Sequence, residues 1–303
     1  MMHLQPTRRG FTLIELLVVI TIIGILASMM LMALVGTQET ARAAKTRGLI
    51  KKLDAIVMPR YAEYMNRRVP VTRRTPTDLP PTGESMSVFG ARRLMMLREL
   101  MRLEMPDRFS DITDNPITHI RGGQPSDPLL PRPAVSRAYL RRLNAATNRT
   151  DTHQGAESLY MFVMLGAEDS DAITHFSDND IKDVDGDGLP EFVDGWGNPI
   201  SFIRWPAGFA SPMQSLDASK DYDQFDARHV QGTPTNPTER AYAMFPLIYS
   251  AGPDGIQDLA ANPVGTDIYT PTSGVKSGQP IDSDTDGEFN HADNIHNHDS
   301  QLR

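Results

Sequence analysis

The first apolar stretch of the chain is long enough to cross a membrane. The run from Leu16 to Thr37 holds 22 residues without a charge, and as a helix it would measure about 33 Å at roughly 1.5 Å per residue. A cleaved secretory signal is the main alternative, but its apolar core would be shorter and would end in small residues. Met29 to Val35 continues the run beyond Ala27-Ser28, the weak candidate for such a cleavage site. We therefore expect a permanent anchor.

Beyond this run, the apolar positions keep a helical spacing. They recur at steps of three and four residues, at Ala41, Ala44, Leu49, Ile50, Leu53, Ile56 and Val57. Pro59 predicts the end of the helix, which gives a stem over residues 11–58. We expect the outer half of this stem to lay its apolar stripe on a globular head.

The rest of the chain predicts a head of mixed structure. Helical apolar spacing appears at residues 92–105, 134–144 and 156–165, and the best strand candidates are 199–205 and 242–250. The expected fold class is α+β, in which a long N-terminal transmembrane helical stem packs on a small antiparallel-sheet head with extra helices.

Charge is distributed unevenly along the chain. Residues 1–150 carry 23 Lys and Arg against 12 Asp and Glu, whereas residues 151–303 carry 7 against 26. The net charge of −8 therefore combines a basic first half with an acidic second half, and the acidic half is suited to holding cations. Because the chain has no cysteine, disulfides, thiolate zinc sites and cysteine nucleophiles are excluded.

The start of the anchor carries a specific motif. After Arg8-Arg9, the chain reads GFTLIELLVVI from Gly10 onward. This sequence resembles the N-terminal signal of type IV pilins and of type II secretion pseudopilins. The resemblance implies that a prepilin peptidase cuts between Gly10 and Phe11 and methylates Phe11. It also implies that Glu15 meets the N-terminal amine of a neighbouring subunit.

The position of Glu15 agrees with that role on physical grounds. A carboxylate that reaches mid-bilayer unpaired costs on the order of 2.5–3.5 kcal/mol, although by position alone Glu15 would snorkel to the interface. A newly exposed amine at Phe11 of an adjacent subunit is a suitable partner. Such a pair adds little net stability but fixes the axial register of the two helices. We predict an assembly residue and not a catalyst.

Two signals disagree about the orientation of the anchor. Lys and Arg are more numerous after the apolar run than before it, so a positive-inside count would leave the large domain in the cytoplasm. The resemblance implies a cytoplasmic N-terminus, a single pass through the cytoplasmic (inner) membrane and a periplasmic or extracellular head. The expected divisions are a leader (1–10), a transmembrane helix (11–36), an outer stem (37–65), an Arg/Pro-rich and helical insertion (66–180) and an acidic sheet domain (181–303).

Two loops of the acidic half have the spacing of EF-hand calcium loops. In each, three alternating aspartates and a glycine are followed, after five intervening residues, by a further aspartate. Alternating acids bring oxygens around one centre, and the glycine allows a sharp turn. The predicted Ca2+ ligands are Asp183, Asp185, Asp187 and Asp194 in the first loop and Asp282, Asp284, Asp286 and Asp293 in the second. Neither loop is clearly flanked by two helices, and simple solvation of the head is the alternative.

Two turns beside the predicted strands add a second calcium prediction. Residues 194–199 (DGWGNP) and 250–255 (SAGPDG) resemble segments that flank the calcium site of the major pseudopilin. The resemblance implies that Ser250, Asp254 and Asp293 are ligands, so Asp293 belongs to two predictions. Ordinary turns built from Gly, Asn and Pro are the alternative.

No catalytic signature is present in the sequence, which lacks the G-x-S-x-G, H-E-x-x-H, Walker and G-x-G-x-x-G patterns. The histidines 291, 296 and 298 match no zinc spacing, and we expect them in a solvated tail. Arginine pairs at 67–68 and 73–74 lie in a predicted loop over 66–90 without interleaved aromatic residues. Nucleic acid is therefore not an expected partner.

Together these features predict a structural, non-enzymatic subunit of a pseudopilus or type IV pilus-like filament, stabilised by calcium. Its expected partners are the prepilin peptidase, the inner membrane, and other copies or related pilin-like subunits that pack through the N-terminal helix. One departure is the long insertion, because major pseudopilins pass quickly from stem to sheet. The alternative is a membrane-tethered envelope calcium-binding protein, adhesin or enzyme that uses a pilin-type export signal.

Overall fold

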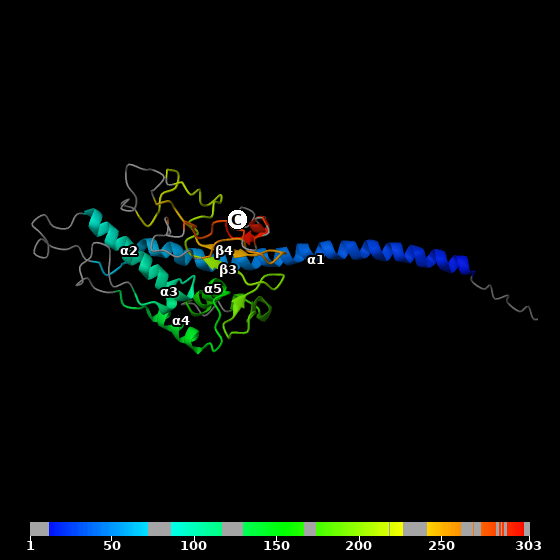
Figure 1. The fold of residues 1–303 in the computed structure, drawn as a ribbon, viewed down its shortest axis with the longest axis horizontal. Helices are drawn as coiled ribbons and strands as arrows, with labels where there is room; N and C mark the ends of the chain where they lie inside the picture. Colours follow the sequence, from blue (N-terminus) through cyan, green and yellow to red (C-terminus); the bar gives the residue numbers. More distant parts are fainter. Residues whose placement is uncertain are drawn as a thin grey trace, which may run out of the picture.

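One helix, α1 (Leu13–Glu63), runs through the length of the molecule. Its 51 residues span about 77 Å at 1.5 Å per residue. The N-terminal half projects alone, and the C-terminal half lies inside the head (Figure 1). The computed structural model describes residues 12–71, 86–116, 130–166, 174–217, 219–226, 241–261, 269, 274–282, 285, 287 and 290–299.

The predicted end of the stem at Met58 is wrong, because α1 continues through Pro59. Proline lacks the N–H that bonds to the carbonyl four residues earlier, and it usually breaks a helix interior. Packing holds the turn beyond it, since Tyr61 is 2% exposed and its hydroxyl donates to the Met244 carbonyl at 2.7 Å. Tertiary burial thus outweighs the local signal.

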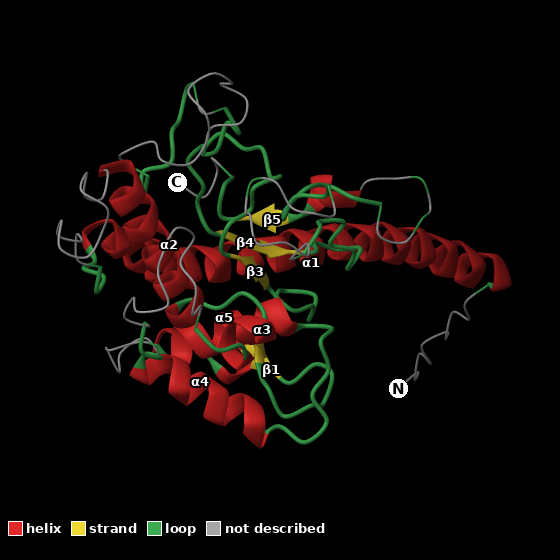
Figure 2. Ribbon diagram, turned by 60° about the vertical axis from the view of Figure 1, so that its left-hand side comes forward, coloured by secondary structure: helices red, strands yellow, loops and turns green. Residues whose placement is uncertain are grey.

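The head contains further helices and two small sheets (Figure 2). Its described helices are α2 (Met86–Glu104), α3 (Phe109–Thr113), α4 (Ala134–Ala145) and α5 (Gln154–Leu165). Short 3-10 turns are η1 (Tyr64–Asn66), η4 (Asp178–Asp180) and η6 (Asn290–Asp293). The predicted helices at 92–105, 134–144 and 156–165 are confirmed, while α3 was not predicted.

All strand pairs are antiparallel in the described part of the chain. β1 (Ile181–Lys182) pairs with β2 (Glu191–Phe192) as a hairpin. The second sheet has the order β3-β4-β5, with β3 (Ser201–Ile203) and β5 (Ile295–His296) on either side of β4 (Leu247–Ser250). The predicted α+β fold with a small antiparallel sheet is confirmed.

One core joins the stem, the insertion and the sheet. α5 packs on β2 and β3, and α1 packs on β4 and β5. The cluster includes completely buried side chains from all three parts, among them Ile50, Leu53, Leu97, Leu159 and Ile248. Of the predicted stem stripe, Leu49, Ile50, Leu53 and Val57 are buried, whereas Ala41 and Ala44 are exposed. The insertion is therefore part of the head and not an appended unit.

A buried ion cluster fixes the insertion to the sheet. Arg204, just after β3, is 1% exposed and lies 2.9 Å from Asp111 and 3.6 Å from Asp107. Its backbone N–H donates to Asp107 at 3.0 Å. Removing one partner of such a group leaves an uncompensated buried charge, so the cluster fixes the position of α3 beside β3.

The C-terminal histidines do not form the solvated tail that we expected. Ile295 and His296 pair with β4 as an edge strand, and His298 is 1% exposed. The two ring nitrogens of His298 lie 3.0 Å from the Ser211 hydroxyl and 3.1 Å from the Pro246 carbonyl. The contacts of His298 with Ser211 and Pro246 hold this C-terminal segment against the head, where a solvated tail was expected.

A tight turn after Asp194 attaches the head to the outer stem. The Gly195 N–H donates to the Thr46 hydroxyl at 2.9 Å, and the Trp196 indole donates to Glu39 at 2.7 Å. A Cβ at Gly195 would lie only 2.4–2.8 Å from backbone atoms of Arg42. Glycine is required here because the turn and the stem backbones approach so closely.

This contact predicts opposite effects for two glycine substitutions. Gly195→Ala should lower the free energy of unfolding by about 1–3 kcal/mol, because its methyl group meets the Arg42 backbone. Gly48→Ala is the control, because Gly48 lies on α1, the helix that carries Arg42, and has open space around it. This substitution should raise the free energy of unfolding by up to about 1 kcal/mol. Denaturant unfolding of the full-length chain in detergent micelles measures both. Equal effects would contradict the docking of this turn.

Candidate functional sites on the stem and in the acidic loops

The stem begins with a reciprocal cap between Thr12 and Glu15. The Glu15 carboxylate accepts from the Thr12 N–H and hydroxyl, both at 2.9 Å, and the Glu15 N–H donates to the Thr12 hydroxyl at 3.3 Å. This capping box satisfies free N–H groups at the helix start. A carboxylate has about four lone-pair sites, so Glu15 can accept further bonds. Gly10 and Phe11 lie outside the described residues.

The inner half of α1 is an exposed apolar surface. Of the nineteen large hydrophobic side chains exposed in the described part of the chain, fifteen lie between Leu13 and Leu34. The helix has a mean hydropathy of 2.7 in its most apolar window, none of which is buried, and it is the one membrane-span candidate among the described residues. Leaving each such side chain in water forfeits roughly 1.5–3 kcal/mol of burial free energy. This surface requires an apolar environment.

The first acidic loop connects β1 to β2 and is organised by Asp183. One carboxylate oxygen of Asp183 accepts from the N–H of Gly186 at 2.8 Å and of Asp187 at 3.1 Å, and the other accepts from Gly188 at 3.0 Å. Gly186 and Gly188 have φ of 77° and 93°, values that favour glycine. The sharp turn predicted from the glycine spacing is present.

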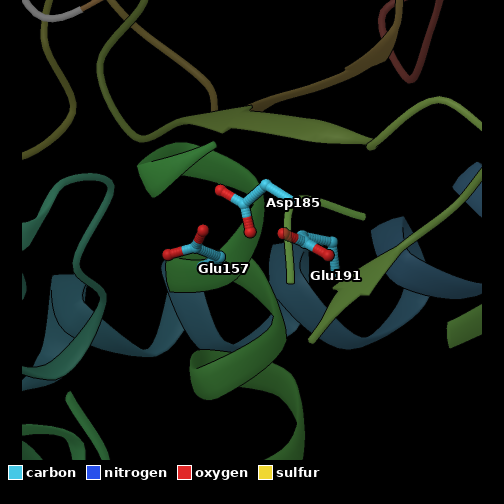
Figure 3. Close-up of side chains that lie close together, drawn as sticks. All are labelled: Glu157, Asp185 and Glu191. Atoms are coloured by element: carbon cyan, nitrogen blue, oxygen red, sulfur yellow. The ribbon is translucent and has the colours of Figure 1, made fainter. Parts of the chain in front are cut away.

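Carboxylates converge on this loop from two directions. Oxygens of Asp183, Asp185 and Asp187 lie within 4.8 Å of one another, and so do oxygens of Glu157, Asp185 and Glu191. Figure 3 shows the second group, with Glu157 on α5 and the other two on the hairpin.

Two members of this second group, Glu157 and Glu191, were not predicted from the sequence. Glu191 occupies the ninth position of the twelve-residue pattern that begins at Asp183, which can contribute to a calcium loop through water. Its spacing could therefore have identified it. Glu157 lies 26 positions before Asp183, and only the packing of α5 against β2 brings it to the loop.

Burial changes the protonation of both glutamates. Each is 0% exposed. Burial, followed by the nearby charges of Asp187 and Glu191, raises the pKa of the Glu157 carboxyl to about 9. Burial also raises the pKa of Glu191 to about 7, against an opposing hydrogen bond from the Val184 N–H. Without a cation, the cluster cannot carry all its negative charges at neutral pH.

Asp194, the predicted closing ligand of the first loop, lies in a different arrangement. One of its oxygens accepts from the N–H groups of Trp196, Gly197 and Asn198 at 2.8, 2.8 and 2.9 Å. The other accepts from the Ser250 hydroxyl at 2.6 Å. Asp194 is 2% exposed and caps the turn that docks on the stem, so it is not brought together with Asp183, Asp185 and Asp187.

The described part of the second loop repeats the geometry of the first. Asp282 accepts from the Gly287 N–H at 3.0 Å, as Asp183 does from Gly188. Thr285 and Gly287 have φ of 63° and 90°, at the positions of Gly186 and Gly188. Asp284 and Asp286 lie outside the described residues.

The ligands implied by the pseudopilin resemblance are only partly brought together. Burial and the nearby charge of Asp254 raise the pKa of Asp293. Gly252 lies close to Asp293, since a Cβ there would be 2.8 Å from its carbonyl oxygen. However, Ser250 is buried against Asp194, and Asp254 accepts from the Ile256 N–H at 2.9 Å. Among the described residues, Asp254 and Asp293 belong to no converging group of three acids.

The role of Asp194 as a cap makes a prediction. Asp194→Ala leaves three N–H groups and one hydroxyl without their acceptor, and it should lower the free energy of unfolding by about 2–4 kcal/mol. The loss should be equal in millimolar calcium and in EDTA, as measured by denaturant unfolding of the full-length chain in micelles. A loss seen only in calcium would make Asp194 a metal ligand instead.

Comparison with known proteins identifies the N-terminal segment. A family model described as the prokaryotic N-terminal methylation motif matches residues 6–31. No curated protein and no solved structure matches the chain. The matched segment includes the Thr12–Glu15 cap and much of the exposed apolar half of α1. This match supports the resemblance of the N-terminal segment to type IV pilin and pseudopilin precursors.

Proposed function

We propose that this protein is a structural, non-enzymatic subunit of a pseudopilus or type IV pilus-like filament of the type II secretion kind. The observation that carries the proposal is the continuity of α1. A methylation motif starts the helix, its inner half exposes apolar side chains, and its outer half forms the core of the head. A filament subunit needs this division, because one half packs among neighbours and the other displays the head.

The exposed half of α1 fits two successive environments. Before assembly, the uncharged run from Leu16 to Thr37 spans about 33 Å, close to the thickness of a bilayer core. After assembly, the stems of neighbouring subunits replace the lipid around the same side chains. Because both surroundings are apolar, the transfer costs little hydrophobic free energy.

Glu15 would then set the register between neighbours. Removal of residues 1–10 by the prepilin peptidase frees an amine at Phe11, and Thr12 stays in place to hold the Glu15 carboxylate. The lone pairs that remain on Glu15 accept from the amine of the adjacent stem. A slipped neighbour leaves both charges unpaired in an apolar surrounding, which is costly.

The same proposal places the protein in the cytoplasmic membrane with a cytoplasmic N-terminus and an exported head. Binding of Ca2+ at Ser250, Asp254 and Asp293 stays a prediction from the pseudopilin resemblance. A tethered adhesin or enzyme would share the anchor but would not need stem-to-stem register, so assembly is the property to test.

Crosslinking between stems tests the proposal. Because the chain has no cysteine, a Ser28→Cys substitution on the exposed inner helix provides a single reporter. In native membranes, oxidation should give a disulfide-linked dimer, because one cysteine per subunit can form only one disulfide. Adding Glu15→Ala should reduce the yield of this dimer about tenfold or more, which corresponds to roughly 1.4 kcal/mol. The helix should still insert, because a costly polar group has been removed.

Glu63→Ala is the matched control, since it removes an exposed carboxylate from the same helix outside the apolar half. This variant should leave the yield of the dimer unchanged. An undiminished dimer in Glu15→Ala would contradict the register role, and the absence of any dimer in the Ser28→Cys parent would favour a tethered monomer.

A further inference from the structure

The carboxylate group formed by Glu157, Asp185 and Glu191 has features that solvation does not explain. Both glutamates are 0% exposed. Neither oxygen of Glu157 has a hydrogen-bond partner, and Oε1 of Glu191 also lacks one. In the described part of the chain, none of the three forms an ion pair with Lys or Arg. Buried polar atoms almost always have partners, so these oxygens point to a missing one.

Oxygens of the three residues converge, although Asp185 and Glu191 also accept hydrogen bonds from the Thr150 hydroxyl and the Val184 N–H. One oxygen from each residue lies within 4.8 Å of the other two, and in Figure 3 Asp185 lies between the two glutamates. Oxygens on opposite sides of one calcium ion lie about 4.6–5.2 Å apart, which is twice the usual bond length. The group has the size of a calcium coordination shell.

We propose that Glu157, Asp185 and Glu191 bind one calcium ion, which joins helix α5 to the hairpin β1–β2. Asp183 and Asp187 add negative charge beside the site, because their oxygens lie within 4.8 Å of one another and of an oxygen of Asp185. This site differs in its closing ligands from the loop pattern in the sequence, and it shares no residue with the Ser250, Asp254 and Asp293 set. It goes beyond the proposed function, because it does not depend on assembly.

The chemistry of the donors favours calcium over other divalent ions. All the converging donors are carboxylate oxygens, and no histidine belongs to either group, so nitrogen- and sulfur-seeking metals are disfavoured. Calcium takes six to eight oxygens in flexible geometry, whereas magnesium demands a compact octahedron. Three converging carboxylates from α5 and the hairpin, with two more beside them, suit the larger ion.

The elements around the group are already held in position. The Thr150 hydroxyl, just before α5, donates to Asp185 at 2.6 Å, and the Thr150 N–H donates to Asp187 at 3.2 Å. Asp183 fixes the turn through three backbone N–H groups. The N-terminal turn of α5, which carries Glu157, favours negative charge through the helix dipole. Calcium would therefore meet a preformed site.

Thermal unfolding of the full-length chain in detergent micelles tests the site, with calcium chloride and EDTA as the two conditions. At a calcium concentration about 100-fold above Kd, the melting temperature of the parent should rise by roughly 5 °C. Glu157→Gln should abolish this rise while melting in EDTA no lower than the parent, because the neutral amide has nearly the same size as the carboxyl and carries no charge to bury. Glu191→Gln should do the same, which provides a second variant if one folds poorly.

Asp178→Asn is the matched control, since it removes one exposed acid from the same acidic region outside the cluster. It should keep the full calcium-dependent rise. Isothermal titration with calcium should show one site that both glutamine variants lose. A parent chain that calcium leaves unchanged would overturn the proposal, because protons alone would then neutralise the cluster. Glutamine variants that keep the rise would also overturn it, by placing the ion elsewhere.

Discussion

Burial of the outer stripe of α1 is the interaction on which the rest of the structure depends. Ile50, Leu53 and Val57 are completely buried and contact side chains from the insertion and from the sheet in one cluster. The inner half of the same helix has no such cover. Because the helix is continuous, any environment that binds the inner half also fixes the head at a set distance, and this rigid coupling is what makes the helix a stem.

Much of this architecture could be predicted because its signals are local and repeated. The uncharged run to Thr37 and the three- and four-residue steps after it identify the stem. The helix end predicted at Pro59 is wrong because proline disturbs only the local backbone. Burial of Tyr61 and Tyr64 stabilises the chain beyond it. The prediction of a solvated histidine tail is wrong for a related reason. Ile295 pairs with β4, and no local pattern reveals such a long-range contact.

In the acidic loops, too, the sequence predicts the local turn but not which carboxylates come together. Alternating aspartates and positive-φ positions follow from spacing, and Asp183 organises its turn accordingly. Asp194 is the twelfth residue of the calcium-loop pattern, but the chain enters β2 at Glu191, and Asp194 does not lie with the other aspartates of the loop. Asp194 instead satisfies three backbone N–H groups, while α5 supplies Glu157. Packing decides which carboxylates come together around the loop, and the sequence does not display it.

We propose that α1 is the processed stem of a pilin-like subunit, so the mature N-terminus should be Phe11. The N-terminal mass of the protein from its native membranes is the direct test. Glycine at position 10 lets the backbone enter a peptidase site that a larger side chain would obstruct. Intact mass spectrometry should find a chain that begins at N-methylated Phe11. A chain that still begins at Met1 or Met2 would contradict the account.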